Sequence, residues 1–135
     1  MASEKSFHCS LLTPDGQLLD RDVTFAAIYA HDGEIGFLHN RGPLVCALGT
    51  GEVRVESSEG ADRFFIDSGF AQMLDNQLSI LTEHAEAADA LDPSQAEAQL
   101  EEALGLPEND EAERAIRSAA VHRARSRLQF LRKRS

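Results

Sequence analysis

The chain has 135 residues, enough for one domain or for one domain plus an appendage, and 42% of them are hydrophobic, which is ordinary for a globular protein. Its longest apolar run is only a few residues, so we expect no transmembrane span, and residues 1–10 lack the apolar stretch of a signal peptide. The two cysteines, Cys9 and Cys46, form no C-x-x-C motif and have no zinc-type spacing. We interpret them as buried thiols of a protein that is kept in a reducing compartment.

The charge of the chain is divided unequally along its length. The net charge is -10, but residues 1–113 contain 5 basic and 23 acidic residues, whereas residues 114–135 contain 8 basic residues and no acidic ones. A concentrated basic tail indicates a partner of opposite sign. Nucleic acid, an acidic surface of another protein and the chain's own acidic body all fit this requirement.

Alternating apolar and polar residues predict β-strands in the first part of the chain. Phe7, Cys9 and Leu11 alternate with His8 and Ser10, and Thr13-Pro14-Asp15-Gly16 has the composition of a turn. Further strands are expected at residues 22–30, 53–56, 64–66, 69–74 and 78–81, with a break at residues 67–69. Short strands with frequent turns favour an antiparallel β-sandwich or barrel over residues 1–87.

Residues 88–135 are predicted to form an antiparallel two-helix hairpin behind a small acidic linker at residues 85–90. Asp92 can cap the first helix, Pro93 suits its first position, and Gly105 is a natural stop. A second helix is expected from Asn109 or Asp110 to about Arg132. The expected apolar stripes are Ala96, Leu100, Ala103 and Leu104 in the first helix, and Ala112, Ile116, Ala119, Val121, Ala124, Leu128 and Leu131 in the second.

The predicted fold class is therefore α+β, mainly β: an N-terminal sandwich or barrel followed by a C-terminal helical hairpin. The apolar stripes of the hairpin consist mostly of Ala and Leu, which bury little area, so we expect the hairpin to be the mobile part.

No set of residues in the sequence has the spacing of a catalytic or metal site. We weigh His31 and His39, which flank Gly33–Gly36, as a weak metal-binding pair, but no two histidines stand four residues apart on one predicted helix. Gly33-x-x-Gly36 and Gly49-x-Gly51 match neither a dinucleotide fingerprint nor a P-loop, and we interpret both as turns. The pattern favours a binding or coupling role over catalysis, and we expect neither a catalytic residue nor a metal.

Several short motifs, in this order, resemble those of the ε subunit of F-type ATP synthases. The motifs are Thr13-Pro14-Asp15-Gly16, Gly33-Glu34-Ile35-Gly36-Phe37-Leu38, Pro43-Leu44, Gly51-Glu52-Val53-Arg54-Val55, Phe65-Ile66-Asp67-Ser68-Gly69-Phe70, Leu78-Ser79-Ile80-Leu81, Leu91-Asp92-Pro93 and Arg123-Ala124-Arg125-Ser126-Arg127. Two departures stand out, since Ser68 replaces a common Gly, and His39-Asn40-Arg41-Gly42 stands where the family usually has Pro-Gly-His-Ala.

The resemblance implies a non-catalytic rotor subunit that couples transmembrane proton flow to ATP synthesis from ADP and phosphate. The β domain would bind the γ subunit and the c-ring, with Glu34 and Arg41 in the contacting loops. The hairpin would be regulatory and would impede ATP hydrolysis by the αβ catalytic head through its basic helix, which carries Arg114, Arg117, Arg123 and Arg127. The implied location is peripheral, on the cytoplasmic face of the bacterial inner membrane rather than on a thylakoid.

In some bacterial members of this family the hairpin binds ATP through an acidic residue and several arginines. Glu86, Asp92, Arg123 and Arg127 match such positions, whereas Gln95 and Glu102 stand where two arginines would be. Because phosphate groups need that positive charge, we expect no ATP binding and no other cofactor.

Two other classes of function stay open on the residues alone. One is a free-standing small binding module with a basic C-terminal helix, and the other is a small enzyme. We expect no nucleic acid partner, because Phe130 is the only aromatic residue after residue 70 and cannot interleave with the arginines to stack on bases.

Overall fold

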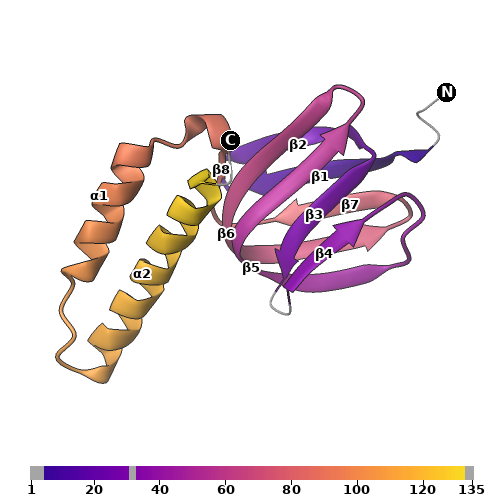
Figure 1. Cartoon of the computed structure of the whole chain (residues 1–135). Helices are drawn as coiled ribbons and strands as arrows, with labels where there is room; N and C mark the ends of the chain where they lie inside the picture. Colours follow the sequence, from indigo (N-terminus) through magenta and orange to yellow (C-terminus); the bar gives the residue numbers. More distant parts are fainter. Residues whose placement is uncertain (1–4, 31–32, 133–135) are drawn as a thin grey trace. The chain divides into compact units, whose positions relative to one another are not determined.

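In the computed structural model, which describes residues 5–30 and 33–132, strands build one unit of the chain and helices build the other (Figure 1). The two compact units are Met1–Ala87 and Ala88–Ser135.

The strands of the first unit form one continuous set of pairings in the order β2-β1-β7-β6-β5-β3-β4, with β8 paired to β6. Their bounds are β1 Phe7–Thr13, β2 Gly16–Val23, β3 Phe25–Ala30, β4 Gly33–Phe37, β5 Leu44–Ser57, β6 Gly60–Leu74, β7 Gln77–Leu81 and β8 Ala85–Ala87. Within the described residues the pairs are antiparallel except β1–β7, which is parallel. The predicted β-sandwich followed by a helical hairpin is confirmed, and its antiparallel pattern is broken at the parallel β1–β7 pair.

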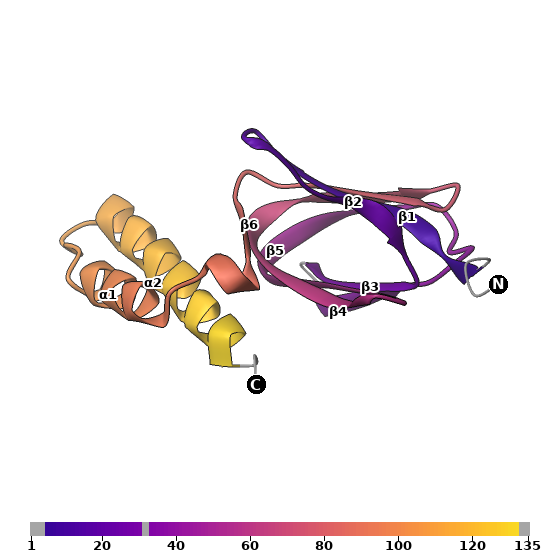
Figure 2. The same ribbon diagram turned by 90° about the horizontal axis from the view of Figure 1, so that it is seen from above.

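The strands are arranged as two layers, which Figure 2 shows with β1 and β2 in one layer and β3 and β4 in the other. The long strands β5 and β6 belong to both layers, because their paired halves bend at Gly49 and Ser68, between the Leu48–Gly69 and Thr50–Asp67 pairs. Ser68 and Gly69 have positive φ values of 67° and 146°. The expected break at residues 67–69 is wrong, since these residues bend β6 without ending it.

The core lies between the two layers and follows the period of two seen in the sequence. Phe7, Cys9 and Leu11 of β1 are buried, as expected from their alternation. The other apolar core residues are Leu19, Val23, Ala26, Ile28, Phe37, Leu48, Val53, Val55, Phe64, Ile66, Ala71, Met73, Leu78 and Ile80.

Several segments differ from the sequence-based expectation. The stretch expected as one strand at residues 22–30 is two strands, because the chain bends at Thr24, whose backbone N–H donates to the carbonyl oxygen of Glu56 at 2.8 Å. Gly33–Gly36 and Gly49–Gly51, both expected to be turns, lie within strands β4 and β5 instead. Ala85–Ala87, expected in a linker, is strand β8. It pairs with Phe64–Ile66 of β6 and so provides hydrogen-bond partners for the backbone of β6 at this edge.

The second unit contains a short 3-10 helix, η2 (Ala88–Ala90), and the two predicted helices, α1 (Pro93–Leu104) and α2 (Glu111–Arg132). The Asp92 carboxylate accepts a hydrogen bond from the Ser94 backbone N–H at 3.0 Å, as expected of an N-cap. At the start of α2, Asp110 accepts from the Glu113 N–H and Glu113 accepts from the Asn109 N–H, which makes a reciprocal cap.

The apolar stripe predicted for α2 is only partly correct. Val121 and Ala124 are buried, but Ala112, Ile116 and Ala119 are exposed, with Ile116 exposed at 64%. Arg117 and Arg127 are only partly exposed and contact α1 instead. Among the described residues, neither helix is long and apolar enough to cross a membrane.

Candidate docking surface

A row of apolar side chains crosses the outer face of the layer that contains β1, β7, β6 and β5. Leu12 pairs with Leu81, Leu81 with Phe70, and Phe70 with Ala47. Directly paired residues point to the same side of a sheet, so the four side chains are neighbours. Phe70 and Leu81 are 60% and 52% exposed, and Val45, two residues before Ala47 on the same side of β5, is 66% exposed. We call Leu12, Val45, Ala47, Phe70 and Leu81 the apolar face.

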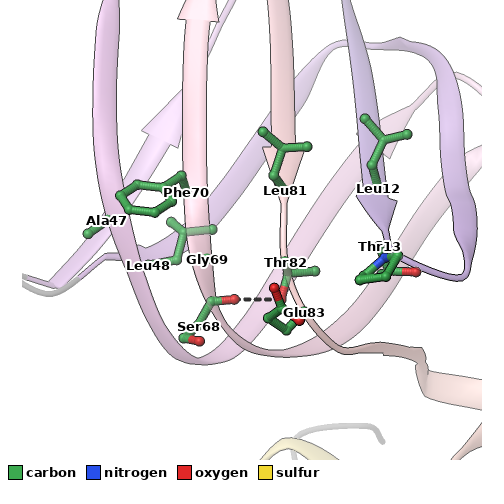
Figure 3. A pocket seen from close by; sticks show the side chains of 11 residues that line it. Leu12, Thr13, Ala47, Leu48, Ser68, Gly69, Phe70, Leu81, Thr82 and Glu83 are labelled. Carbon is green, nitrogen blue, oxygen red and sulfur yellow. Dashed lines mark hydrogen bonds between the residues drawn. The ribbon is translucent and has the colours of Figure 1, made fainter.

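A groove continues the apolar face at the edge where the chain leaves β1 and β7 (Figure 3). It has a volume of about 590 Å³ and is open to solvent. Its lining residues are Leu12, Thr13, Pro14, Ala47, Leu48, Ser68, Gly69, Phe70, Leu81, Thr82 and Glu83. Most of this lining is apolar, so the groove suits an apolar side chain from a partner better than a charged ligand.

The shape of the groove depends on a close approach of two strands at Gly69. A Cβ atom at this position would lie 2.1 Å from the carbonyl oxygen of Leu81 and 2.9 Å from the Cα of Thr82. The Thr82 hydroxyl donates a hydrogen bond to the carbonyl oxygen of Ser68, which fixes the same bend (Figure 3). Only glycine therefore fits at position 69.

The opposite end of the same outer face is polar and carries a titratable group. His8 Nδ1 lies 3.1 Å from an Asp22 carboxylate oxygen, and His8 Nε2 contacts the Asp20 carboxylate. The hydrogen bonds to Asp22 and Asp20 raise the pKa of His8 above its usual value. Ser10, Ser79 and Gln72 lie between this cluster and the row formed by Leu12, Leu81 and Phe70.

Glu34 and Arg41, predicted as contact residues, are both exposed, but the structure places them at opposite ends of β4. Glu34 is the second residue of β4 and is paired with Tyr29, whereas Arg41 follows the end of the strand. The Arg41 guanidinium lies 5.6 Å from the centre of the Phe37 ring, a cation–π contact with the last residue of β4.

The loop that carries Arg41 turns at Asn40 and is tied down by a side-chain amide pair. Asn40, at the position of the family's Gly, has a φ of 67°, which asparagine tolerates better than most residues. Its side chain is paired with that of Asn76, whose Nδ2 donates to the Asn40 Oδ1 at 3.0 Å, and its backbone N–H donates to the Asn76 Oδ1 at 2.6 Å. The amide pair joins this loop to the β6–β7 turn.

The second unit has a groove of about 380 Å³ between its two helices, lined by Gln99, Glu102, Ala103, Leu106, Ala120, Arg123, Ala124 and Arg127. Arg127 Nη1 donates to Gln99 Oε1 at 2.8 Å. Arg117 donates from Nε and Nη2 to the carbonyl oxygen of Leu104, at 3.4 Å and 3.3 Å.

The four residues predicted as a nucleotide site lie in three different places in the structure. Arg123 and Arg127 line the groove between the helices together with Glu102, whose negative charge would repel a phosphate group there. Asp92 is the N-cap of α1, and Glu86 lies in β8 of the first unit, with an oxygen 3.5 Å from His84 Nε2.

The described residues, 5–30 and 33–132, contain no group of three His, Cys, Asp or Glu side chains that could hold a metal ion. His31, weighed above with His39, lies outside this part of the chain; His39 Nδ1 is 3.0 Å from the carbonyl oxygen of Ser6. Burial raises the pKa of the Cys9 thiol to about 12, so this thiol stays protonated and inert at neutral pH. Cys46, expected to be buried as well, is only partly buried.

Sequence reasoning missed the apolar face. The signal was present, since Leu12, Phe70 and Leu81 stand at the positions of alternating strands where a solvent-facing polar residue is expected. Only the pairing of β1 with β7 shows that they are neighbours.

Comparison with known proteins agrees with this architecture. Residues 6–88 match the family model of the ATP synthase delta/epsilon chain β-sandwich domain. The ATP synthase epsilon chain of Rhodopirellula baltica is 39% identical over 123 residues, which span 91% of this chain and 96% of the relative. The epsilon chain of Bacillus pumilus is 32% identical over 127 residues, which span 92% and 95%.

Solved structures give the same result at the level of the fold. A chain of the Euglena gracilis mitochondrial ATP synthase, solved with OSCP, F1 and the c-ring in rotational state 1, superposes with a TM-score of 0.82 and 27% identity over 92% of this chain and 79% of that one. A chain of the central stalk and c-ring of the Tetrahymena thermophila mitochondrial ATP synthase has a TM-score of 0.66 at 14% identity, over 94% of each chain, and shows the fold alone.

These matches confirm the resemblance drawn from the sequence motifs. The chain belongs to the family of ATP synthase epsilon chains.

Proposed function

We propose that the chain is a non-catalytic subunit of the central stalk of a proton-translocating F-type ATP synthase, in which it transmits rotor movement to ATP synthesis. The observation that carries the proposal is the apolar face, because an exposed apolar row on a folded sheet marks a protein contact. Its occupant would be the γ subunit, with an apolar side chain of γ in the groove beside Gly69. The solved structures of similar chains come from assemblies with F1, the central stalk and the c-ring.

The remaining contacts would lie at the two ends of β4. Glu34, at the exposed start of β4, would meet polar loops of the c-ring, and Arg41 would lie in the margin of the contact. As an epsilon chain, the protein is a peripheral subunit of a membrane complex, and we place that complex on the cytoplasmic face of the bacterial inner membrane. Loss of ATP-driven proton pumping in Glu34→Lys, with normal assembly, would support the c-ring contact; unchanged pumping would count against it.

The docking proposal is tested by placing a charge on the apolar face. Phe70→Asp and Leu81→Asp each remove apolar area that docking would bury and place a carboxylate in the contact. A loss of at least about 2 kcal/mol is expected, which weakens binding to γ about thirtyfold. Ile116→Asp is a matched control, because Ile116 is exposed at 64% on α2, outside the sheet. Equal retention of γ by all three variants would refute the apolar face as the contact.

The hairpin would act as a brake on ATP hydrolysis through the positive charge of α2. Arg114 and Arg123 are exposed on this helix and would meet acidic surfaces of the αβ head. Deleting residues 111–135 should leave the complex assembled and raise its ATPase rate, and neutralising Arg123 and Arg127 should raise it in part. An unchanged ATPase rate in the truncated, fully assembled enzyme would refute the brake and indicate that α2 only packs within its own unit.

A further inference from the structure

The charges of α1 oppose the dipole of this helix. Its ionisable side chains are Glu97, Glu101 and Glu102, and two of these lie in its last turn, where no basic residue is present. The C-terminal end of a helix carries partial negative charge, so carboxylates there are unfavourable. Glu97 and Glu101 are also four residues apart, which brings two like charges together on one face. The charge pattern of α1 therefore disfavours its own helix.

The length and the packing of α1 do little to offset this. The helix has 12 residues, and isolated helices shorter than about 12–15 residues are marginal in water. Its buried residues are Ala96 and Ala103, two small side chains. Asp92 and Pro93 support the first turn, but no side chain of α1 supplies a cation for the last one.

Helix α2 supplies that cation. The Arg117 guanidinium donates two hydrogen bonds to the carbonyl oxygen of Leu104, the last residue of α1, and lies 3.9 Å from a carboxylate oxygen of Glu108. A positive charge at this position stabilises the helix end that α1 leaves without a cation of its own. Farther along, Arg127 donates to Gln99 in the middle of α1 at 2.8 Å.

Helix α2 does not depend on α1 in the same way. It has 22 residues, its own reciprocal cap through Asp110 and Glu113, acidic residues in its first turn and Arg132 in its last turn. The dependence between the two helices is therefore one-sided.

We propose that α1 is a conditional helix, which stays folded only while Arg117 and Arg127 of α2 lie against it, so that the hairpin opens by melting α1 rather than by parting two intact helices. Melting lengthens the connection to α2: twelve residues span about 18 Å as a helix and up to about 40 Å when extended. The proposal concerns the free chain and stands whether or not the hairpin acts as a brake.

The test is residue-resolved NMR of the free chain, with Cα chemical shifts and amide exchange of residues 93–104. In a chain that lacks residues 111–135, these residues should lose their helical shifts while the resonances of the β unit keep their positions. In that truncated chain, Glu102→Lys gives α1 its own C-terminal cation and should restore part of the helical shift. Retention of full helical shifts in the truncated chain would overturn the proposal.

A point variant of the full chain tests the role of Arg117 without removing α2. Arg117→Ala should speed amide exchange in α1 about two- to fivefold, the effect of losing one cation at a helix end. Arg125→Ala removes the same charge from an exposed position of α2 and serves as the control. Equal exchange in the two variants would also overturn the proposal, because it would show that the contact to Leu104 does not hold α1.

Discussion

The bend at Ser68 and Gly69 allows a sharp prediction, because neighbouring substitutions should have opposite effects. In Gly69→Ala, the new methyl group would lie 2.1 Å from the Leu81 carbonyl oxygen, a backbone atom that cannot turn aside as a flexible side chain can. The backbone φ of 146° is also one that alanine rarely adopts. Strain of this kind costs about 1–3 kcal/mol, and the steric overlap adds to it.

We therefore expect Gly69→Ala to lower the free energy of unfolding by at least about 3 kcal/mol. For a unit of this size, each kcal/mol shifts the melting temperature by about 4–8 °C, so Tm should fall by about 12–24 °C. Ser68→Gly should act in the other direction. Serine at a φ of 67° is strained, and relief of that strain, less the added freedom of glycine in the unfolded chain, should stabilise by up to about 1 kcal/mol.

The measurement is thermal unfolding followed by circular dichroism in the strand region, for both variants and for Gly49→Ala. Gly49 lies in the same bend, but a Cβ there would meet no atom within 4 Å and its φ is ordinary, so this control should change stability by less than about 0.5 kcal/mol. If Gly69→Ala melts within 3 °C of the parent, roughly under 1 kcal/mol, the close approach of β6 to Leu81 is not rigid and the reasoning fails.

Three other predictions follow from the structure. Because the pKa of His8 is raised in the folded chain, His8 contributes stability that is complete below pH 6.5 and is lost as pH rises through the pKa of the folded state. Urea midpoints measured from pH 5.5 to 8.5 should therefore fall with pH in the parent and not in His8→Gln. The same pH dependence in both proteins would argue against this role of His8. Titration calorimetry with Mg-ATP should give no binding heat to the free chain, because Glu102 shares the groove with Arg127; micromolar affinity would contradict this. A fragment that ends at Ala87 keeps β8 and should melt cooperatively with dispersed amide resonances, whereas a disordered spectrum would refute its independence.

The strand unit was predictable to the extent that its side chains alternate. Period-two patterns located β1, β7 and most of the core, because burial on one face of a sheet requires that alternation. Glycine was misleading for a physical reason. Gly36 was interpreted as part of a turn, but it lies within β4, where a Cβ would be 3.2 Å from the Phe25 ring. A glycine that makes room for an aromatic ring and a glycine that turns the chain are indistinguishable in a single sequence.

The candidate site was less predictable than the fold, because it depends on which strands are neighbours. Leu12 and Leu81 are far apart in the sequence, and a single leucine outside the core gives no signal of a docking surface. The parallel pairing of β1 with β7 joins them into one surface with Phe70, and parallel pairing of distant strands has no local sequence signal. The charge of His8 likewise depends on Asp20 and Asp22 across the β1–β2 pair.

In the helical hairpin, the apolar residues of α2 correctly predict a helix but do not identify which of its faces contacts α1. Helical spacing places Ile116 in the predicted apolar stripe of α2, yet it is 64% exposed, while its neighbour Arg117 lies against α1. An arginine can pack its aliphatic stem and still place its guanidinium on a carbonyl oxygen, so a helix end in need of a cation can favour it over isoleucine.

The same contacts bear on the unequal charge of the chain. From the sequence, three partners fit the basic tail: nucleic acid, another protein and the chain's own acidic body. In the structure, Arg117 of this tail contacts α1, whose ionisable residues are all acidic. Any external acidic surface must therefore compete with α1 for Arg117. Because Arg117 and Arg127 together support the helical form of α1, a partner that binds α2 in place of α1 also destabilises α1. The hairpin should therefore open in one cooperative step as salt or a competing surface weakens the contact.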